Sequence, residues 1–352
     1  MKSRIGSACT VPVEHIAAAR DNASRPARLA LATNDRHGRD WNRSIALAAI
    51  KQSIRASLYR TGITPAIARL RRRTCVLMLH GVGGAELDAD VFGEMVVYLK
   101  RHFRPLSLAA LVAELDEPPL VARPAVVLTF DDGLANNVTV AYPILERHAV
   151  PAAFFVCPGL IDAGSWLWTH EVRARLAMLD EPTRRALAPE LPTCDVGVIV
   201  QHLKELAPTA RAHGIEAVRA ATPAFTPSAA QRQACDLADW AQLALLDPAL
   251  VTIGSHSSSH DIMIGMDEAR LEREVVGSKA RIETMLGRKV EHFCYPNGDF
   301  DAAADARVRA TYASALSTRV GLVPPLAPDR HALPRLAVPD DVSSLALRMA
   351  LA

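Results

Sequence analysis

The chain has 352 residues, of which 50% are hydrophobic, 22% charged and only 5% aromatic. This length accommodates about two domains, or one α/β barrel of about 250 residues with extensions, and the apolar content is ample for a large buried core. Forty Lys and Arg against 38 Asp and Glu leave a formal net charge of +2, which argues against a general nucleic-acid binder, a disordered chain and a fibrous repeat.

The first 73 residues are much more basic than the rest of the chain. They hold 15 Lys or Arg and 4 Asp or Glu, a surplus of +11. Apolar residues between Ile45 and Leu58 fall near one face of a predicted helix, with Lys51, Arg55 and Arg60 as its polar counterpart. Such a helix is typical of peripheral contact with an anionic membrane or an acidic partner. The alternative is an extension that packs on the main domain with a solvated arginine face.

Two features bear on the compartment. The first ten residues contain no apolar core of a secretory signal, and no run of about 18 apolar residues predicts a transmembrane helix. The six cysteines form no C-x-x-C pair, which is typical of reduced thiols in a core. We therefore expect a cytoplasmic location, with association at the inner face of the membrane as the alternative that the basic segment raises.

From Cys75 onward, short apolar runs alternate with amphipathic stretches, a pattern that favours βαβ units around a parallel sheet. The predicted strands are Cys75–Leu79, Ala125–Phe130, Ala152–Val156, Leu250–His256, Val290–Tyr295, Tyr312–Leu316 and Leu333–Val338. The predicted helices are Ala89–Phe103, Leu108–Leu115, Asn136–His148 and Glu268–Leu286, the last with Gly287 as its C-cap.

The alternation is lost over about residues 171–235, where Leu and Ala are mixed with Arg, Glu and Pro. This composition predicts a helical insertion. We therefore expect a basic, mostly helical extension over residues 1–73, followed by an α/β domain over residues 74–340 that contains the insertion.

Polar residues follow three of the predicted strands, where the loops of an α/β barrel converge on its active site. After the first of these strands, Asp131 and Asp132 stand side by side before Gly133. Two adjacent carboxylates at the end of a buried strand cost free energy through repulsion and desolvation, unless a cation binds them or one of them is protonated. One of them on a metal and the other as a proton acceptor is one interpretation; a solvated turn with an Asp as N-cap is the other.

The second set is His256 and His260, directly after a predicted strand. Imidazoles four positions apart lie on the same side of a helical turn, so that both can reach one cation. A third set, Tyr295–Gly298, takes a strand into a turn that contains Pro296 and Asn297. A backbone amide there can face a developing oxyanion, although a plain β-turn explains these residues equally well.

These three motifs, in this order, resemble the polysaccharide deacetylase family, also known as the NodB-homology group or carbohydrate esterase family 4. The resemblance covers about Cys75 to Val338, apart from the insertion. Further similarities are Leu79-His80, the segment Phe103–Leu108, Trp166-Leu167-Trp168 and His331–Arg335. The resemblance implies a deformed (β/α) barrel that holds one divalent metal, commonly Zn²⁺.

Carried over residue by residue, the resemblance makes Asp132, His256 and His260 the metal ligands and Asp131 the general base. The metal lowers the pKa of its water and polarises the acetamide carbonyl, while the metal and a turn amide near Tyr295 or Asn297 hold the oxyanion. Trp166 and Trp168 are expected to stack on a sugar ring or to lie in the core.

The sequence departs from the family pattern at two places. Cys294 occupies the position where the family usually has an Arg that orients the base, and we expect Arg335 on the last strand to supply this guanidinium. The family's general acid is normally a His after an apolar residue near the last strand. Here His331 is the nearest His, out of the usual order, and His80 is a second candidate near the same rim.

The resemblance thus predicts a metal-dependent hydrolase that removes the acetyl group of an N-acetylated sugar in a polysaccharide such as an exopolysaccharide, an oligosaccharide or a lipid-linked intermediate. Two alternatives keep the same fold. One is a hydrolase of another linear or cyclic amide, and the other is a degenerate carbohydrate-binding module.

Overall fold

The structure is a computed structural model that describes residues 51–71, 73–83, 87–117 and 123–352. The chain divides into two units at Ile50 and Lys51, and the second unit runs to Ala352. The predictions for residues 1–50, including the first half of the basic amphipathic helix, lie outside the described residues.

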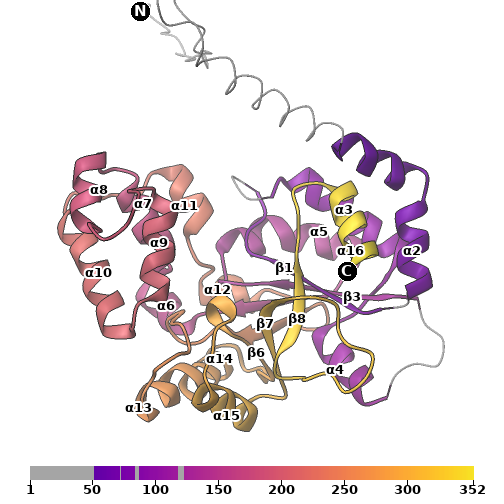
Figure 1. The fold of residues 1–352 in the computed structure, drawn as a ribbon. Coiled ribbons are helices and arrows are strands. Elements are labelled where there is room, and N and C mark those ends of the chain that lie inside the picture. Colours follow the sequence, from indigo (N-terminus) through magenta and orange to yellow (C-terminus); the bar gives the residue numbers. More distant parts are fainter. Residues whose placement is uncertain (1–50, 72, 84–86, 118–122) are drawn as a thin grey trace, which may run out of the picture. The chain divides into compact units, whose positions relative to one another are not determined.

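Parallel strands form the centre of the second unit (Figure 1). The sheet runs in the order β1-β8-β7-β6-β5-β4-β3-β2. Because β1 also pairs with β3, seven of these strands close into a barrel, and the short β2 pairs with β3 alone without being one of the seven. The deformed (β/α) barrel expected from the sequence is confirmed. The strands are β1 (Cys75–Leu79), β2 (Arg104–Pro105), β3 (Ala125–Phe130), β4 (Ala152–Val156), β5 (Val251–Ser255), β6 (His292–Cys294), β7 (Ser314–Val320) and β8 (Leu333–Ala337).

The register of these strands aligns their carboxyl ends. Every residue of β3 and β4 is buried, as expected for strands that are covered on both faces. Leu79 of β1 pairs with Phe130 of β3, and Val156 of β4 pairs with Ser255 of β5. The residues that follow these strands therefore come out along one edge of the barrel.

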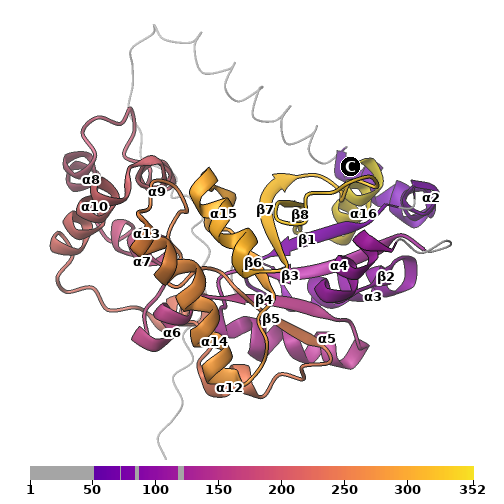
Figure 2. The ribbon, with the colours of Figure 1, turned by 90° about the horizontal axis from the view of Figure 1, so that it is seen from below.

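Helices cover the outside of the barrel (Figure 2). The segments predicted as two long helices each contain a π-helical turn, Asn137–Ala141 before α5 and Glu272–Gly277 between α13 and α14. Gly287 has φ 63° and ends α14 in the left-handed region, as its sequence position predicts. The covering helices are α3 (Ala89–His102), α4 (Leu108–Asp116), α5 (Tyr142–His148), α13 (Glu268–Leu271), α14 (Ser278–Leu286), α15 (Ala302–Thr311) and α16 (Val342–Leu351).

The segment between β4 and β5 is helical, as predicted. Its middle part has a core of its own, which includes Val172, Ile199, Leu203 and Val218, and its helices form a group beside the barrel (Figure 1). The helices of the whole segment are α6 (Pro158–Ala163), α7 (Trp168–Leu176), α8 (Glu181–Leu187), α9 (Val196–Glu205), α10 (Pro208–Ala220), α11 (Ala229–Cys235) and α12 (Trp240–Ala244).

The described part of the basic segment packs on the barrel domain. Residues 51–60 are helical, and α2 (Ile63–Arg71) lies against α16. The Arg55 guanidinium donates to Ser344 Oγ at 3.2 Å. Helix packing thus joins the described part of the extension to the barrel domain, and the boundary at residue 73 stays a prediction. No helix of the described chain is both long and apolar enough to span a membrane.

Candidate metal centre and active site

Asp131 and Asp132 leave β3 at the edge where the carboxyl ends of the strands lie. The Asp131 amide donates to Leu79 O at 2.9 Å, which continues the β1–β3 pairing by one residue. Asp132 then turns the chain with φ 73°, and Gly133 follows with φ 70°. A Cβ on Gly133 would lie 3.1 Å from a methyl group of Val156, so the turn needs glycine for space as well as for its backbone. This strained turn directs Asp132 into the site.

Three buried side chains converge on one point at this edge. Oδ1 of Asp132 lies 3.5 Å from Nε2 of His256 and 3.3 Å from Nε2 of His260. One ligand atom from each residue lies within 4.8 Å of the other two, and all three residues are buried. One carboxylate and two imidazoles are a donor set that Zn²⁺ accepts, with room for further ligands.

Neighbouring groups hold the imidazoles in this arrangement. Nδ1 of His256 is 2.7 Å from Cys294 O, so the ring donates this N–H and leaves Nε2 free for a cation. The turn between the two histidines is held by Glu274, whose carboxylate accepts from the amides of Ser258 and Ser259, each at 2.9 Å. The residues present therefore fit a divalent metal.

Asp131 faces a different partner from Asp132. Nη1 and Nη2 of Arg335 donate to Oδ1 and Oδ2 of Asp131 at 2.8 and 2.7 Å. Arg335 is 1% exposed and Asp131 is 3% exposed, so this is a buried, bidentate ion pair. Burial alone raises the pKa of Asp131, but the charge and hydrogen bonds of Arg335 outweigh it and lower the pKa to about 2. Asp131 is therefore a carboxylate at neutral pH and can accept a proton.

Cys294 completes this cluster. Its Sγ lies 3.2 Å from Nη2 of Arg335 and 3.5 Å from Oδ1 of Asp131. Burial raises the pKa of the thiol, so it is protonated at neutral pH and adds no charge. The Arg335 guanidinium thus comes from β8 and contacts both the Asp131 carboxylate and the Cys294 thiol.

Comparison with known proteins identifies the family. The model of the polysaccharide deacetylase family matches residues 121–184 and 191–315, more than half of the chain. The chain belongs to the polysaccharide deacetylase family. It is accordingly a hydrolase acting on carbon–nitrogen bonds other than peptide bonds. No curated protein sequence matches the chain.

Solved deacetylases have the same fold. The deacetylase PplD of Streptococcus pyogenes, solved with acetate, has a TM-score of 0.55 and 17% identity over 79% of this chain and 98% of its own. IcaB of Ammonifex degensii has a TM-score of 0.53 and 17% identity over 80% of this chain and 97% of its own. A polysaccharide deacetylase of Bacillus cereus has a TM-score of 0.52 and 15% identity over 79% of this chain and 69% of its own.

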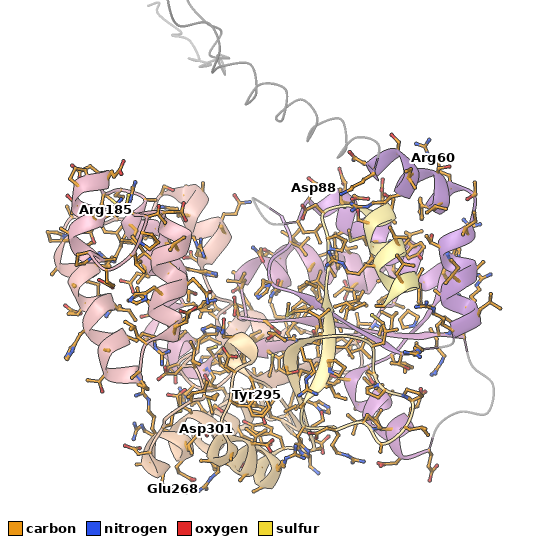
Figure 3. All side chains as sticks on the ribbon, in the orientation of Figure 1. Arg60, Asp88, Arg185, Glu268, Tyr295 and Asp301 are labelled. Carbon is orange, nitrogen blue, oxygen red and sulfur yellow. The ribbon has the colours of Figure 1, made fainter. Side chains whose placement is uncertain are left out.

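Two of the predicted site residues, His331 and Tyr295, do not take their predicted roles. His331 precedes β8, and its Nε2 is 2.9 Å from the carbonyl oxygen of Tyr312, which precedes β7. His331 and Tyr312 thus lie at the amino ends of their strands, whereas the site lies at the carboxyl ends. The prediction of His331 as the general acid is therefore wrong. The Tyr295 side chain, labelled in Figure 3, is buried against Phe300 with ring centroids 4.0 Å apart, and is not a surface for a sugar. The Tyr295 amide donates to Leu316 O at 3.1 Å and is not free for an oxyanion.

The other predicted substrate-binding residues lie nearer the expected edge. His80 follows β1, is exposed, and its charge acts on both Asp131 and Asp132. Asn297 has φ 59° in the turn after β6. Trp166 donates from Nε1 to Asp236 at 2.6 Å, and Trp168 begins α7; both rings are partly buried. The predicted stacking of these two rings on a sugar stays a prediction.

Two site residues were missed at the sequence level because both come from the helical insertion. Nε2 of His170, on α7, lies 3.9 Å from Oδ2 of Asp132. Lys204, on α9, donates from Nζ to Oδ1 of Asn297 at 2.9 Å. Neither residue follows a strand or forms part of a motif, so the sequence held no signal for them. Only the packing of the insertion reveals them.

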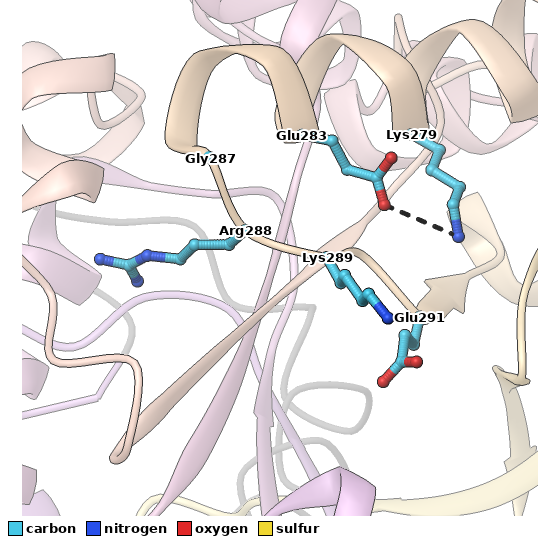
Figure 4. Close-up of a pocket in the computed structure, with 6 residues that line it drawn as sticks. All are labelled: Lys279, Glu283, Gly287, Arg288, Lys289 and Glu291. Carbon is cyan, nitrogen blue, oxygen red and sulfur yellow. Dashed lines mark ion pairs between the residues drawn. The ribbon is translucent and has the colours of Figure 1, made fainter.

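Several surface hollows lie on the described part of the barrel domain. One of about 280 Å³ is at the carboxyl ends of β1 and β8, next to the site, and is lined by residues that include Leu79, His80, Val338 and Asp340. Another of about 500 Å³ lies where α14 leads into β6 (Figure 4). It is at the amino end of β6, opposite to the metal centre, and is not part of the active site.

Proposed function

We propose that this protein is a metal-dependent deacetylase that hydrolyses the N-acetyl group of an N-acetylated sugar, with Zn²⁺ as the metal. The observation that carries the proposal is the convergence of Asp132, His256 and His260 beside the carboxylate of Asp131, at the carboxyl ends of the barrel strands. Family membership supports an N-acetylated carbohydrate as substrate.

Asp132, His256 and His260 would hold the metal, which when bound supplies a Lewis acid for the amide carbonyl and lowers the pKa of water. Asp131 accepts the proton of the attacking water, since its pKa of about 2 keeps it ionised. Arg335 holds both oxygens of this carboxylate and thereby fixes the direction from which it takes the proton. The products are acetate and a free amine on the sugar.

The experiment is acetate release from a panel of N-acetylhexosamine oligomers, lipid-linked N-acetyl sugars and cyclic amides, with the metal content of the protein measured alongside. We expect acetate from sugars, loss of release on chelation, and its return with Zn²⁺. Asp131→Asn should lower turnover by about 100-fold or more, as removal of a general base does. Ring opening of a cyclic amide without acetate release from any sugar would replace this proposal by an amidase. Binding of sugars without hydrolysis of any compound would replace it by a binding module.

We also propose a cytoplasmic location, with residues 1–73 in peripheral contact with an anionic membrane or an acidic partner. The support is the surplus of +11 charges in this segment. Lys51, Arg60, Arg69 and Arg71 are exposed in its described part, although that part also packs on the barrel. Flotation of the full chain with vesicles containing phosphatidylserine, compared with neutral vesicles, tests the membrane contact. Equal recovery with both kinds of vesicle contradicts it.

A further inference from the structure

The helical insertion brings cationic side chains to the metal centre, although it supplies none of the proposed ligands. His170 and Arg173 lie three positions apart on α7, a spacing that places them on the same side of the helix. His170 reaches to 3.9 Å from Asp132, and Lys204 of α9 bonds the turn at Asn297. The charges of Arg173 and Asp132 both act on Lys204. The insertion therefore places His170 beside Asp132 and Lys204 beside the turn that follows β6.

Lys204 has a different kind of partner from the two fully buried arginines, Arg211 and Arg335. Arg335 pairs with Asp131, and Arg211 pairs with Asp261 at 3.0 Å. Lys204 is half-buried, and its hydrogen-bond acceptor is the neutral amide oxygen of Asn297. Within residues 51–71, 73–83, 87–117 and 123–352, no carboxylate forms an ion pair with Lys204.

Arg173 also lacks a counter-ion. It is exposed on α7 and makes no ion pair with a carboxylate of the described chain, whereas its neighbour Arg175 pairs with Glu171 at 2.8 Å. The carboxylates that face Lys204 at longer range are Asp132 and Asp299. They raise its pKa, but burial and Arg173 outweigh them and lower it. Asp299 itself accepts a hydrogen bond from the Asn297 amide. A partly buried ammonium group without an anion is costly, and an anionic ligand would remove that cost.

We propose that Lys204 and Arg173 bind an anionic group of the substrate, so that the site prefers N-acetylated sugars that carry a carboxylate or a phosphate. This inference rests on the proposed deacetylase function. An ammonium group and a guanidinium suit both kinds of anion, because the first is a compact charge and the second donates in pairs. His170, which lies 3.9 Å from Asp132 and one turn before Arg173 on α7, would then lie beside the bound sugar.

The test measures kcat/KM for acetate release from three sugars: N-acetylglucosamine, N-acetylglucosamine 1-phosphate and N-acetylmuramic acid, which carries a carboxylate. We expect at least one anionic sugar to exceed the neutral sugar by about tenfold, which corresponds to about 1.4 kcal/mol. A preference for the phosphate alone identifies a phosphorylated substrate, and a preference for the carboxylate alone identifies a sugar acid.

The variants assign this preference to the insertion. Lys204→Gln keeps an amide that can bond Asn297 but removes the charge, so it should raise KM for the anionic sugar about tenfold and leave kcat nearly unchanged. Lys204→Arg should restore most of the preference. Lys289→Met is the matched control, because Lys289 is exposed at the opposite end of the barrel and should change nothing.

Equal kcat/KM for the neutral and anionic sugars in the unaltered protein overturns the inference and leaves the deacetylase proposal standing. A preference for the anionic sugars that persists in Lys204→Gln also overturns the inference and leaves the deacetylase proposal standing. Release of acetate from no sugar contradicts the deacetylase proposal instead. In that case calorimetry of the same sugars with the full chain decides separately: binding of the anionic sugars that Lys204→Gln abolishes supports the anion site, and binding that this variant leaves intact overturns it.

Discussion

Arg335 is the residue on which the orientation of the proposed base depends. It is buried in β8 and holds both oxygens of Asp131, while its Nε donates to Ser317 O at 2.9 Å. Arg335→Met should lower turnover about 100-fold or more, because Asp131 then loses the charge that keeps it ionised and the two bonds that direct it. Acetate release measures the loss, and the bound metal should stay at the level of the unaltered protein.

Two further variants make this prediction specific. Arg335→Lys keeps the charge but cannot bond both oxygens, so it should recover only part of the turnover. Arg281→Met is the control, because Arg281 is exposed and pairs with Asp162 away from the site. If Arg335→Met folds and retains full turnover, Arg335 has no part in orienting the base. If it does not fold, Arg335→Lys carries the test.

His292 predicts a dependence of stability on pH that is separate from the metal centre. It is 2% exposed at the start of β6, and burial together with the charge of Lys279 lowers its pKa to about 4. Between pH of about 6.5 and 4 the unfolded chain binds this proton and the folded chain does not, so stability is lost as the pH falls through this range. The full effect is about 3 kcal/mol.

Urea unfolding at pH 7.5 and pH 5, with chelator present, measures this effect. His292→Asn removes the titrating group and keeps an amide near Ser314, whose Oγ lies 2.9 Å from Nδ1 of His292. The variant should lose less stability on acidification than the unaltered protein. An identical loss in both proteins would show that His292 does not titrate in this way.

At the residue scale, the sequence predicts side chains whose neighbours are local. Asp131 and Asp132 follow one buried run and His256 and His260 follow another, so their convergence at one edge can be expected before the fold is known. The helical turn predicted for the two histidines does not form, because the segment is an irregular turn with positive φ at Ser257 and His260. His331 shows the limit of this reasoning. It is close to Arg335 in the sequence, but it precedes the amino end of β8, whereas Arg335 lies within β8 and its side chain reaches Asp131 at the opposite edge of the barrel.

At the scale of elements, the insertion acts on the metal centre through α10. Arg211 is 4% exposed, and its Nη2 donates to Oδ1 of Asp261 at 3.0 Å. Asp261 follows the proposed ligand His260, which has φ 57° and is held in an unfavourable backbone conformation. Arg270 also pairs with Asp261. The insertion thus fixes the residue that anchors one end of the ligand turn.

Arg211→Met should therefore weaken the binding of Zn²⁺ about tenfold or more, as the loss of groups that orient metal ligands does. Calorimetric titration of the metal-free full chain measures the Kd. Arg219→Met is the matched control, since Arg219 lies on the same helix but is more exposed and pairs with Glu171. An unchanged Kd in Arg211→Met means that the insertion does not support the metal centre. If that variant is unstable, Asp261→Asn tests the same contact from the other side.

The elements that the sequence predicts well are the ones with a strong pattern. The apolar runs that form β1, β3 and β4 match their predicted bounds. The sequence does not predict the helix α15, because Val308 is the only large apolar residue of its sequence AAADARVRAT, which has little amphipathic character. The π-helical turns within the predicted helices also leave no signal, since one extra residue per turn does not alter the apolar pattern enough to be noticed.

At the scale of the whole molecule, closure of the barrel brings together residues from four parts of the chain. The base and one ligand follow β3, two ligands follow β5, Arg335 comes from β8, and Lys204 comes from the insertion. The alternation of strands and helices predicts the barrel, and hence one common edge. It cannot predict the contacts of the insertion, because its helices are placed by their own core and not by the strand pattern.

Since the proposed ligands lie on two different strands, the metal should stabilise the whole domain. A ligand present at 100 times its Kd stabilises the folded state by about 2.7 kcal/mol. For a domain of this size, with an unfolding entropy of about 2.1 cal/mol/K per residue, that corresponds to a rise in Tm of about 4 °C. Thermal unfolding of the chelated protein, with and without added Zn²⁺, measures this shift, and His260→Ala should abolish most of it. His213→Ala removes an exposed His of α10 and should keep the full shift. Equal shifts in both variants would mean that Zn²⁺ binds somewhere other than at Asp132, His256 and His260.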